Sequence, residues 1–176
     1  MYNIGVNMNN VILCGFMGCG KSTIGKNAAK KTGRRFVDMD EYIEKQAGKT
    51  VAEIFAERGE EGFRELEHEA CIELSKNRNL IVATGGGALT FERNVEVFRE
   101  TDTIVLLDVP LRVIRLRLRY DKKRPLLQRP DRDKVITELY NSRMPKYLAA
   151  ADVVVKGEST PMKTTNSLIA ALNLKK

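Results

Sequence analysis

Residues 15–22 read GFMGCGKS, and this stretch decides how the rest of the 176-residue chain is interpreted. It matches the pattern G-x-x-x-x-G-K-[ST], in which glycines let backbone N–H groups surround phosphate oxygens. The lysine reaches the outer phosphates, the hydroxyl binds Mg²⁺, and the following helix adds the positive end of its dipole. The segment therefore predicts a site for a nucleotide and Mg²⁺. The predicted nucleotide-binding residues are Gly18, Cys19, Gly20, Lys21, Ser22 and Thr23, and Ser22 is also a predicted magnesium ligand.

The sequence around this loop alternates between strand and helix patterns. Short apolar runs, typical of strands buried on both faces of a parallel sheet, occur at residues 11–14, 36–37, 80–83, 103–107 and 153–155. Between them, Thr50 and Glu53 form a capping box for a helix that Gly59 can end, and residues 60–77 carry one apolar stripe. This alternation predicts a three-layer α/β fold with ligands beyond the carboxyl ends of the strands.

Composition places the chain among ordinary globular proteins. It is 43% hydrophobic and 30% charged, which excludes wholesale disorder, and its length suits a single domain over residues 1–176. The formal net charge of +7 suggests a nucleic-acid partner. However, residues 112–132 hold nine basic and two acidic side chains, so this segment alone accounts for the whole excess. The charge therefore indicates a local anion site.

The cysteines and the uncharged N-terminal segment bear on location. Three cysteines form no C-x-x-C pair and no even framework, as expected of a reduced intracellular protein. Residues 1–20 carry no charge, but four Asn and four Gly interrupt them, so they do not match a membrane span. We expect a cytoplasmic protein that does not bind a membrane.

The phosphate-loop pattern is shared by GTPases, motor ATPases and kinases of small molecules. The guanine-reading pattern N-K-x-D is absent, which argues against a GTPase. A second carboxylate near Mg²⁺ is also expected, and the residues alone leave two choices. Asp38 and Asp108 each end a predicted strand, and spacing does not decide between them.

Further motifs make the chain resemble the shikimate kinase family. These motifs are the D-M-D of residues 38–40, G-F-R of 62–64, G-G-G of 85–87, D-K-K-R-P-L-L of 121–127 and R-M-P of 143–145, in that order. The resemblance covers about residues 9–172. It implies a P-loop, nucleoside-monophosphate-kinase-like fold with a five-stranded parallel sheet in the order 2-3-1-4-5. It also implies transfer of the ATP γ-phosphoryl group to the 3-hydroxyl of shikimate, with Mg²⁺.

The resemblance also assigns residues to the acceptor substrate. Arg64 and Arg143 match the family's carboxylate clamp, and a guanidinium suits a carboxylate because it donates two charge-assisted hydrogen bonds. Asp40 matches the aspartate that orients the 3-hydroxyl or takes its proton. Gly86 offers a backbone N–H where a side chain would collide with the substrate ring. Asp38 matches the aspartate on the Mg²⁺ side, typically acting through water. The implied acceptor-binding helical segment spans about residues 40–68.

The basic segment takes its expected role from the same resemblance. Arg124 matches the arginine of a lid that closes over ATP and meets the transferring phosphate, and we expect a mobile lid over about residues 120–132. Arg117 matches the arginine that stacks on adenine. In the loop at 156–161, where related enzymes place Arg or Gln against adenine, this chain has Thr160. The predicted catalytic residues are thus Lys21, Asp40 and Arg124.

Two other functions compete with this interpretation. One is a related P-loop kinase of another small alcohol, such as gluconate or a nucleoside monophosphate. The other is a nucleic-acid-binding module that uses residues 112–132, but such a surface should interleave aromatic stacking residues, and only Tyr120 lies there. We expect a monomer whose partner is a small molecule rather than nucleic acid.

Overall fold

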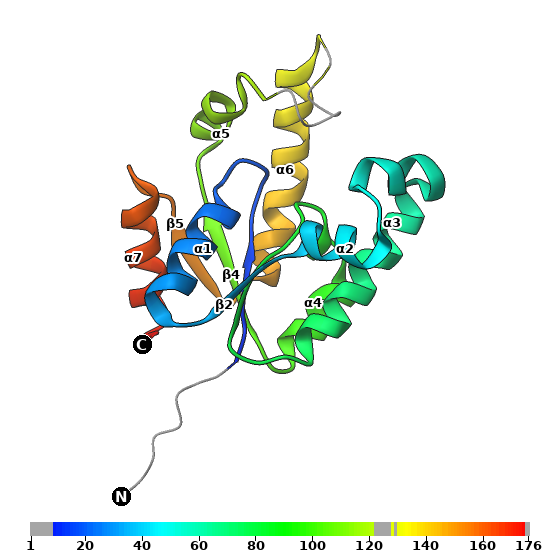
Figure 1. Ribbon diagram of the computed structural model, residues 1–176. Helices are drawn as coiled ribbons and strands as arrows, with labels where there is room; N and C mark the ends of the chain where they lie inside the picture. The colour runs from blue at the N-terminus through cyan, green and yellow to red at the C-terminus, as the bar shows by residue number, and fades with distance from the viewer. Residues whose placement is uncertain (1–8, 122–127, 129, 175–176) are drawn as a thin grey trace, which may run out of the picture.

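Five parallel strands form the centre of the computed structural model, which describes residues 9–121, 128 and 130–174 (Figure 1). The strands are β1 (Val11–Cys14), β2 (Arg35–Asp38), β3 (Leu80–Ala83), β4 (Thr103–Asp108) and β5 (Val153–Lys156), and they lie in the order β2-β3-β1-β4-β5. The predicted parallel sheet and its strand order are confirmed.

Helices cover both faces of this sheet and make the predicted three layers. α1 (Lys21–Thr32) and α7 (Pro161–Ala171) pack together on one face, and α4 (Glu92–Arg99) and α6 (Arg132–Ala150) contact β4 from the other (Figure 1). The remaining elements, α2 (Met39–Ala47), α3 (Val51–Ser75), η1 (Ala88–Thr90) and α5 (Leu111–Leu118), follow strand ends or join these layers. Among the helices of the described residues, none has the length and apolar character to cross a membrane.

Helix α3 begins and bends where its sequence requires. Thr50 accepts a hydrogen bond from the backbone N–H of Glu53, and the Glu53 carboxylate accepts one from the Thr50 N–H, which is the predicted capping box. At Gly59 the backbone leaves the helical region, with φ 67° and ψ −171°, and then turns helical again. Gly59 therefore divides α3 into two helical segments, and Glu60 begins the second.

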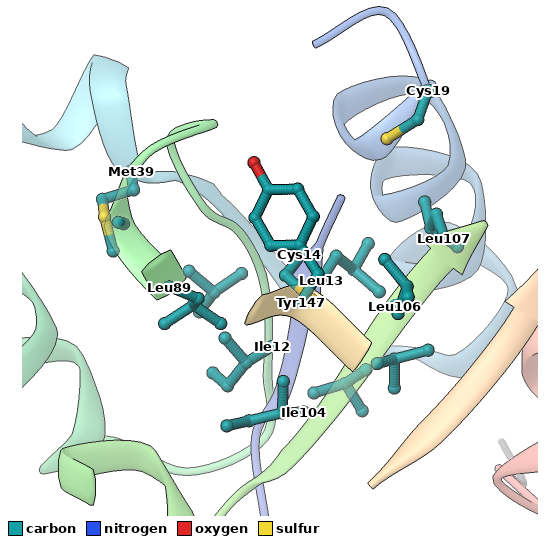
Figure 2. Close-up of a cluster of buried hydrophobic side chains, with 14 of the residues drawn as sticks. Ile12, Leu13, Cys14, Cys19, Met39, Leu89, Ile104, Leu106, Leu107 and Tyr147 are labelled. Atoms are coloured by element: carbon teal, nitrogen blue, oxygen red, sulfur yellow. The ribbon is translucent and has the colours of Figure 1, made fainter. Parts of the chain in front are cut away.

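The core lies between the sheet and the helices of both faces. All four residues of β1 and all four of β3 are buried, as are the four central residues of β4. Figure 2 shows side chains of β1 and β4 packed with Met39 from α2 and Leu89 from η1, and Tyr147 from α6 lies above them. Burial on both faces explains the near-continuous apolar runs of these three central strands. The edge strands β2 and β5 differ from the expectation, since each is exposed in part and Val154 of β5 is 44% exposed.

The register of the strands brings three strand ends to one edge. Leu13 of β1 and Asp38 of β2 both pair with Ala83 of β3. The segments that follow these three strands are the phosphate loop, the start of α2 and the glycine run at 85–87. The sheet topology thus gathers motifs that are up to about seventy residues apart in the chain.

Candidate active site

The phosphate loop joins β1 to α1 through three glycines with left-handed backbone. Gly15, Gly18 and Gly20 have φ of 138°, 77° and 103°. A Cβ at Gly15 would also lie 2.8 Å from the carbonyl oxygen of Leu107, so a side chain is excluded there by contact as well as by conformation. Lys21 Nζ donates hydrogen bonds to the carbonyl oxygens of Gly15 at 2.7 Å and Phe16 at 3.3 Å. The ammonium group of Lys21 therefore lies at the start of the loop, against the carbonyls of Gly15 and Phe16.

Asp38 connects this loop to the acceptor side of the site. Its Oδ2 accepts a hydrogen bond of 2.7 Å from the hydroxyl of Ser22, and its Oδ1 accepts one of 3.1 Å from the backbone N–H of Asp40. The second bond makes Asp38 the N-cap of α2. Ser22 thus has Asp38 beside it, whereas Asp108, the other carboxylate that the sequence offered, ends β4 and lies next to Lys156 of β5 in the sheet.

The pair Ser22 and Asp38 suits a magnesium ion held mainly by phosphates. Mg²⁺ usually keeps several waters and takes one or two protein oxygens together with phosphate oxygens. Within the described part of the chain there is no group of three or more His, Cys, Asp or Glu side chains that could hold a metal by themselves. One hydroxyl and one carboxylate, 2.7 Å apart, therefore fit the donor set that a nucleotide-bound Mg²⁺ needs.

The glycine run at 85–87 forms a wall against which charged side chains pack. A Cβ at Gly85 would lie 2.8 Å from both Asp40 Oδ1 and Glu67 Oε1, and a Cβ at Gly87 would lie 2.5 Å from Arg64 Nη1. At Gly86 the nearest atom to a Cβ would be Arg143 Nη1 at 3.8 Å, an ordinary van der Waals contact. Gly85 and Gly87 therefore have no room for a side chain because α2 and α3 place charged groups against their backbone, whereas the protein itself would admit a Cβ at Gly86.

Arg64 is held in place by a buried glutamate. Its Nη1 donates to Glu67 Oε2 at 2.5 Å, and Glu67 is 1% exposed although it carries a carboxylate. Burial raises the pKa of Glu67 above its usual value, and the hydrogen bond from Arg64 offsets only part of this effect. For Arg64, burial acts to lower the pKa, but Glu67 and Glu60 together raise it. The pair keeps the guanidinium charged and fixed beside Gly87.

Glu67 is a site residue that the sequence interpretation missed. The available signal was its place on α3, four residues after Phe63 and three before Ala70, both of which are buried. A charged residue on an otherwise apolar stripe indicates a buried polar contact. Phe63 and Phe91 also lie within 5.6 Å of the Arg64 guanidinium, at 5.6 and 5.4 Å from their ring centroids.

Arg143 and Tyr147 approach the same glycine run from α6. Arg143 Nη1 donates to the carbonyl oxygen of Gly86 at 3.3 Å, and the hydroxyl of Tyr147 donates to the same oxygen. Tyr147 is 1% exposed and lies among the core residues in Figure 2. The structure therefore brings Asp40, Arg64, Gly86 and Arg143 to one loop, and the core fixes that loop through Tyr147.

A hollow adjoins the phosphate loop on the side of α5 and α7. It has a volume of about 360 Å³, and Gly18, Gly20, Thr23, Arg117, Gly157, Pro161 and Thr164 are among its lining residues. Arg117 donates from Nη1 to the carbonyl oxygens of Gly18 and Cys19, each at 3.1 Å. Thr160 does not line the hollow but caps α7, where it accepts a hydrogen bond from the Lys163 N–H. The hollow adjoins the phosphate loop, as a base-binding site should.

The predicted lid falls largely beyond this description. Residues 122–127 and 129, including Arg124, lie outside the described residues. Of the predicted site residues, all except Arg124 are therefore placed. They form two adjoining groups, one around the phosphate loop and one around the glycine run.

The fold and this site define a P-loop kinase of a small molecule. The family model for shikimate kinase matches residues 17–173 of the chain. A shikimate kinase of Psychrobacter cryohalolentis is 42% identical over 165 residues, covering 93% of this chain and 89% of its own length. A solved shikimate kinase from Acinetobacter baumannii in complex with shikimate is 34% identical with a TM-score of 0.87, covering 96% of this chain and 95% of that one.

The chain belongs to the shikimate kinase family. It is therefore an ATP- and Mg²⁺-dependent phosphotransferase that acts on an alcohol group of shikimate. A gluconokinase from Sinorhizobium meliloti, with a TM-score of 0.60 and 13% identity over 96% of this chain and 94% of its own, shares the fold alone. The gluconate alternative thus receives no support beyond the shared architecture.

Proposed function

We propose that this site transfers the ATP γ-phosphoryl group to the 3-hydroxyl of shikimate, giving shikimate 3-phosphate and ADP, and that its two groups of residues divide the work. The observation that carries the assignment is the contact of Asp38 with both groups. Its carboxylate bonds to Ser22 in the phosphate loop and to the backbone of Asp40 beside the glycine run. A donor phosphate and an acceptor hydroxyl bound to these groups would adjoin, and phosphoryl transfer depends mainly on such positioning.

On the donor side, the backbone N–H groups of residues 18–23 and the Lys21 ammonium bind the phosphates. Lys21 exchanges its contacts with the carbonyls of Gly15 and Phe16 for phosphate oxygens, which accept hydrogen bonds from a cation more strongly. Ser22 would hold Mg²⁺ through its hydroxyl, and the carboxylate of Asp38 beside it would do so through water. When bound, the ion neutralises charge that develops on the phosphate oxygens.

On the acceptor side, Arg64 beside Gly87 and Arg143 beside Gly86 bind the shikimate carboxylate. Glu67 positions Arg64 through the 2.5 Å hydrogen bond, and Tyr147 positions the Gly86 carbonyl. The absence of a side chain at Gly86 lets the substrate ring approach the backbone beside Arg143. Asp40 accepts a hydrogen bond from the 3-hydroxyl, which orients the hydroxyl oxygen toward phosphorus and provides an acceptor for its proton.

Two arginines complete the donor side. Arg117 stacks on the base in the 360 Å³ hollow, after releasing the carbonyls of Gly18 and Cys19. Arg124, which lies outside the described residues, remains assigned from sequence to the transferring phosphate. The proposal includes a monomer that acts on small molecules, without a nucleic-acid or membrane partner.

The direct test is an acceptor panel in a coupled assay of ADP release. The full chain with Mg·ATP should release ADP with shikimate and not with gluconate, AMP or other nucleoside monophosphates. Phosphorus NMR of the product should place the new phosphate ester at the 3-position. Turnover of gluconate at a rate comparable with that of shikimate would contradict the acceptor assignment, and an ester at another hydroxyl would contradict the placement of Asp40.

A further inference from the structure

The guanidinium of Arg64 is held by two glutamates from two different edges. On one edge, Nη1 donates to Glu67 Oε2 at 2.5 Å. On the other edge, Nη2 and Nε both donate to Glu60 Oε1, at 3.0 and 3.3 Å. The side chain of Glu67 is 1% exposed and that of Glu60 is 70% exposed. Arg64 therefore has an inner carboxylate fixed in the protein and an outer carboxylate that faces solvent.

Only the outer edge is available to an incoming carboxylate. Withdrawing Nη1 would leave Glu67 as a buried charge without its cation, and its other oxygen already has no hydrogen-bond partner within the described residues. The Nε–Nη2 edge presents two parallel N–H groups, which is the geometry of a two-point carboxylate contact. Glu60 occupies that edge in this structure. Its pair with Arg64 is an i,i+4 contact of an exposed glutamate, so breaking this ion pair costs little free energy.

We infer that Glu60 is a built-in competitor of the substrate carboxylate. In the free enzyme its carboxylate occupies the Nε–Nη2 edge of Arg64, and shikimate must displace it to bind. The inference rests on the proposed role of Arg64 as a substrate clamp. It also gives Glu60 a part in specificity. An anion that contacts Arg64 alone replaces the Glu60 carboxylate with its own and gains little binding free energy. A ligand that also reaches Arg143 and Asp40 gains contacts that Glu60 does not replace.

The position of Glu60 suits a side chain that must leave. Gly59 breaks α3 immediately before it, and a Cβ at Gly59 would have nothing within 4 Å. The alternative to competition is that Glu60 only places a negative charge at the N-terminus of the second helical segment, where acidic residues stabilise the helix. Glu61 shares that position and is also exposed, but within the described residues it has no hydrogen bond or ion pair. It is the matched control.

The experiment compares Glu60→Gln with Glu61→Gln in the full chain with saturating Mg·ATP. Both variants remove one negative charge from the same helix end, but only the first removes the ion pair to Arg64. We expect Glu60→Gln to lower the shikimate KM by about 2- to 5-fold, the range that an exposed ion pair commands, with kcat and the ATP KM unchanged. Glu61→Gln should leave the shikimate KM within about 1.5-fold of the parent value.

Glu61→Gln controls for general electrostatics, and a second substrate separates an effect on the substrate carboxylate from a change of the whole acceptor site. The methyl ester of shikimate has no carboxylate to exchange with Glu60, so its KM should be the same in Glu60→Gln and in the parent enzyme. An unchanged or raised shikimate KM in Glu60→Gln, an equal decrease in Glu61→Gln, or the same decrease with the ester would each overturn the inference. Absence of shikimate turnover in the parent enzyme, or an unchanged KM in Arg64→Lys, would instead contradict the proposed function on which it rests.

Discussion

The hydroxyl of Ser22 donates a hydrogen bond of 2.7 Å to the carboxylate of Asp38, joining the phosphate loop to the first turn of α2. The two residues meet because β2 and β1 both pair with β3, so their carboxyl ends lie at the same edge of the sheet. The other oxygen of Asp38 caps α2 through the N–H of Asp40. One carboxylate therefore has both a structural and a proposed magnesium-binding role, and these roles can be separated.

Asp38→Asn should keep the cap and weaken the magnesium site. Asn caps helices as well as Asp does, so the melting temperature should stay close to that of the parent protein. Loss of the charge should raise the Mg²⁺ concentration for half-maximal activity by roughly 10- to 100-fold, as for other groups that act through a metal-bound water. A magnesium titration at fixed ATP measures this. Asp108→Asn is the matched control, and a comparable shift in that variant would reverse the choice between the two carboxylates.

Arg64→Lys should weaken shikimate binding without affecting the nucleotide. Lysine keeps the positive charge near Glu67 but loses the two-point edge, so the shikimate KM should rise by about 10- to 100-fold. The ATP KM should stay within about twofold, because the hydrogen-bond partners of Arg64 among the described residues lie outside the phosphate loop.

The control for this variant is Arg93→Lys. Arg93 lies on α4. It pairs with Glu65 of α3 at 2.7 Å and donates a hydrogen bond to the backbone carbonyl of Arg64, so it contacts α3 without contacting the glycine run among the described residues. Its replacement should leave both KM values close to those of the parent enzyme. Equal increases in the shikimate KM for the two variants would show that α3 as a whole has shifted, and would count against a specific clamp.

Gly87→Ala tests whether the bare backbone at 85–87 is there for Arg64. A Cβ at Gly87 would lie 2.5 Å from Arg64 Nη1, so the guanidinium must move away. We expect a shikimate KM raised by roughly tenfold, because the clamp loses its geometry while the flexible side chain absorbs most of the clash. Gly86→Ala has its nearest contact at 3.8 Å and should not change the melting temperature. A parent-like KM in Gly87→Ala would contradict the close packing.

The strands and the phosphate loop were readable from sequence because their signals are local. The phosphate loop follows the first apolar run, residues 11–14, and this identifies that run as a strand. Similar continuous runs, such as residues 80–83 and 103–107, are then also interpreted as strands. The choice between Asp38 and Asp108 was different. Both end strands of the same sheet, and β4, not β2, lies directly beside β1. Neither spacing nor strand order therefore selects Asp38. The family resemblance selected it, and its hydrogen bond with Ser22 agrees with that choice.

Glu67 illustrates the other limit. Its partner Arg64 lies one turn earlier on the same helix, but the glycine run that lies against it is about twenty residues further along the chain. Nothing in the residues around Glu67 shows that this loop packs against α3, so its burial was not recognised. Helix α5 shows a similar limit for apolar residues. Leu116 is 69% exposed, whereas Ile114 and Leu118 are buried. Spacing along a short helix does not by itself tell which face the rest of the fold covers.

Glu67→Gln should remove the pH dependence that Glu67 adds to the free energy of unfolding. Burial raises the pKa of Glu67 in the folded protein, so the folded state binds its proton more tightly than the unfolded chain does. The stability that this group contributes is present below the unfolded pKa, near 4.5, and is lost as the pH rises through the raised folded value. Glutamine does not titrate, so the free energy of unfolding of the parent protein should fall relative to Glu67→Gln over that range.

Urea denaturation at several pH values between 4.5 and 8 measures the difference. The control is Glu73→Gln, which removes an exposed carboxylate paired with Lys76 on the same helix and should run parallel to the parent protein. A difference that grows in favour of the parent protein as the pH rises would mean that Arg64 lowers the pKa of Glu67 more than burial raises it. In the expected case, the stability lost over this range follows from burying the Glu67 carboxylate beside Arg64, since burial disfavours the ionised form more than the ion pair favours it.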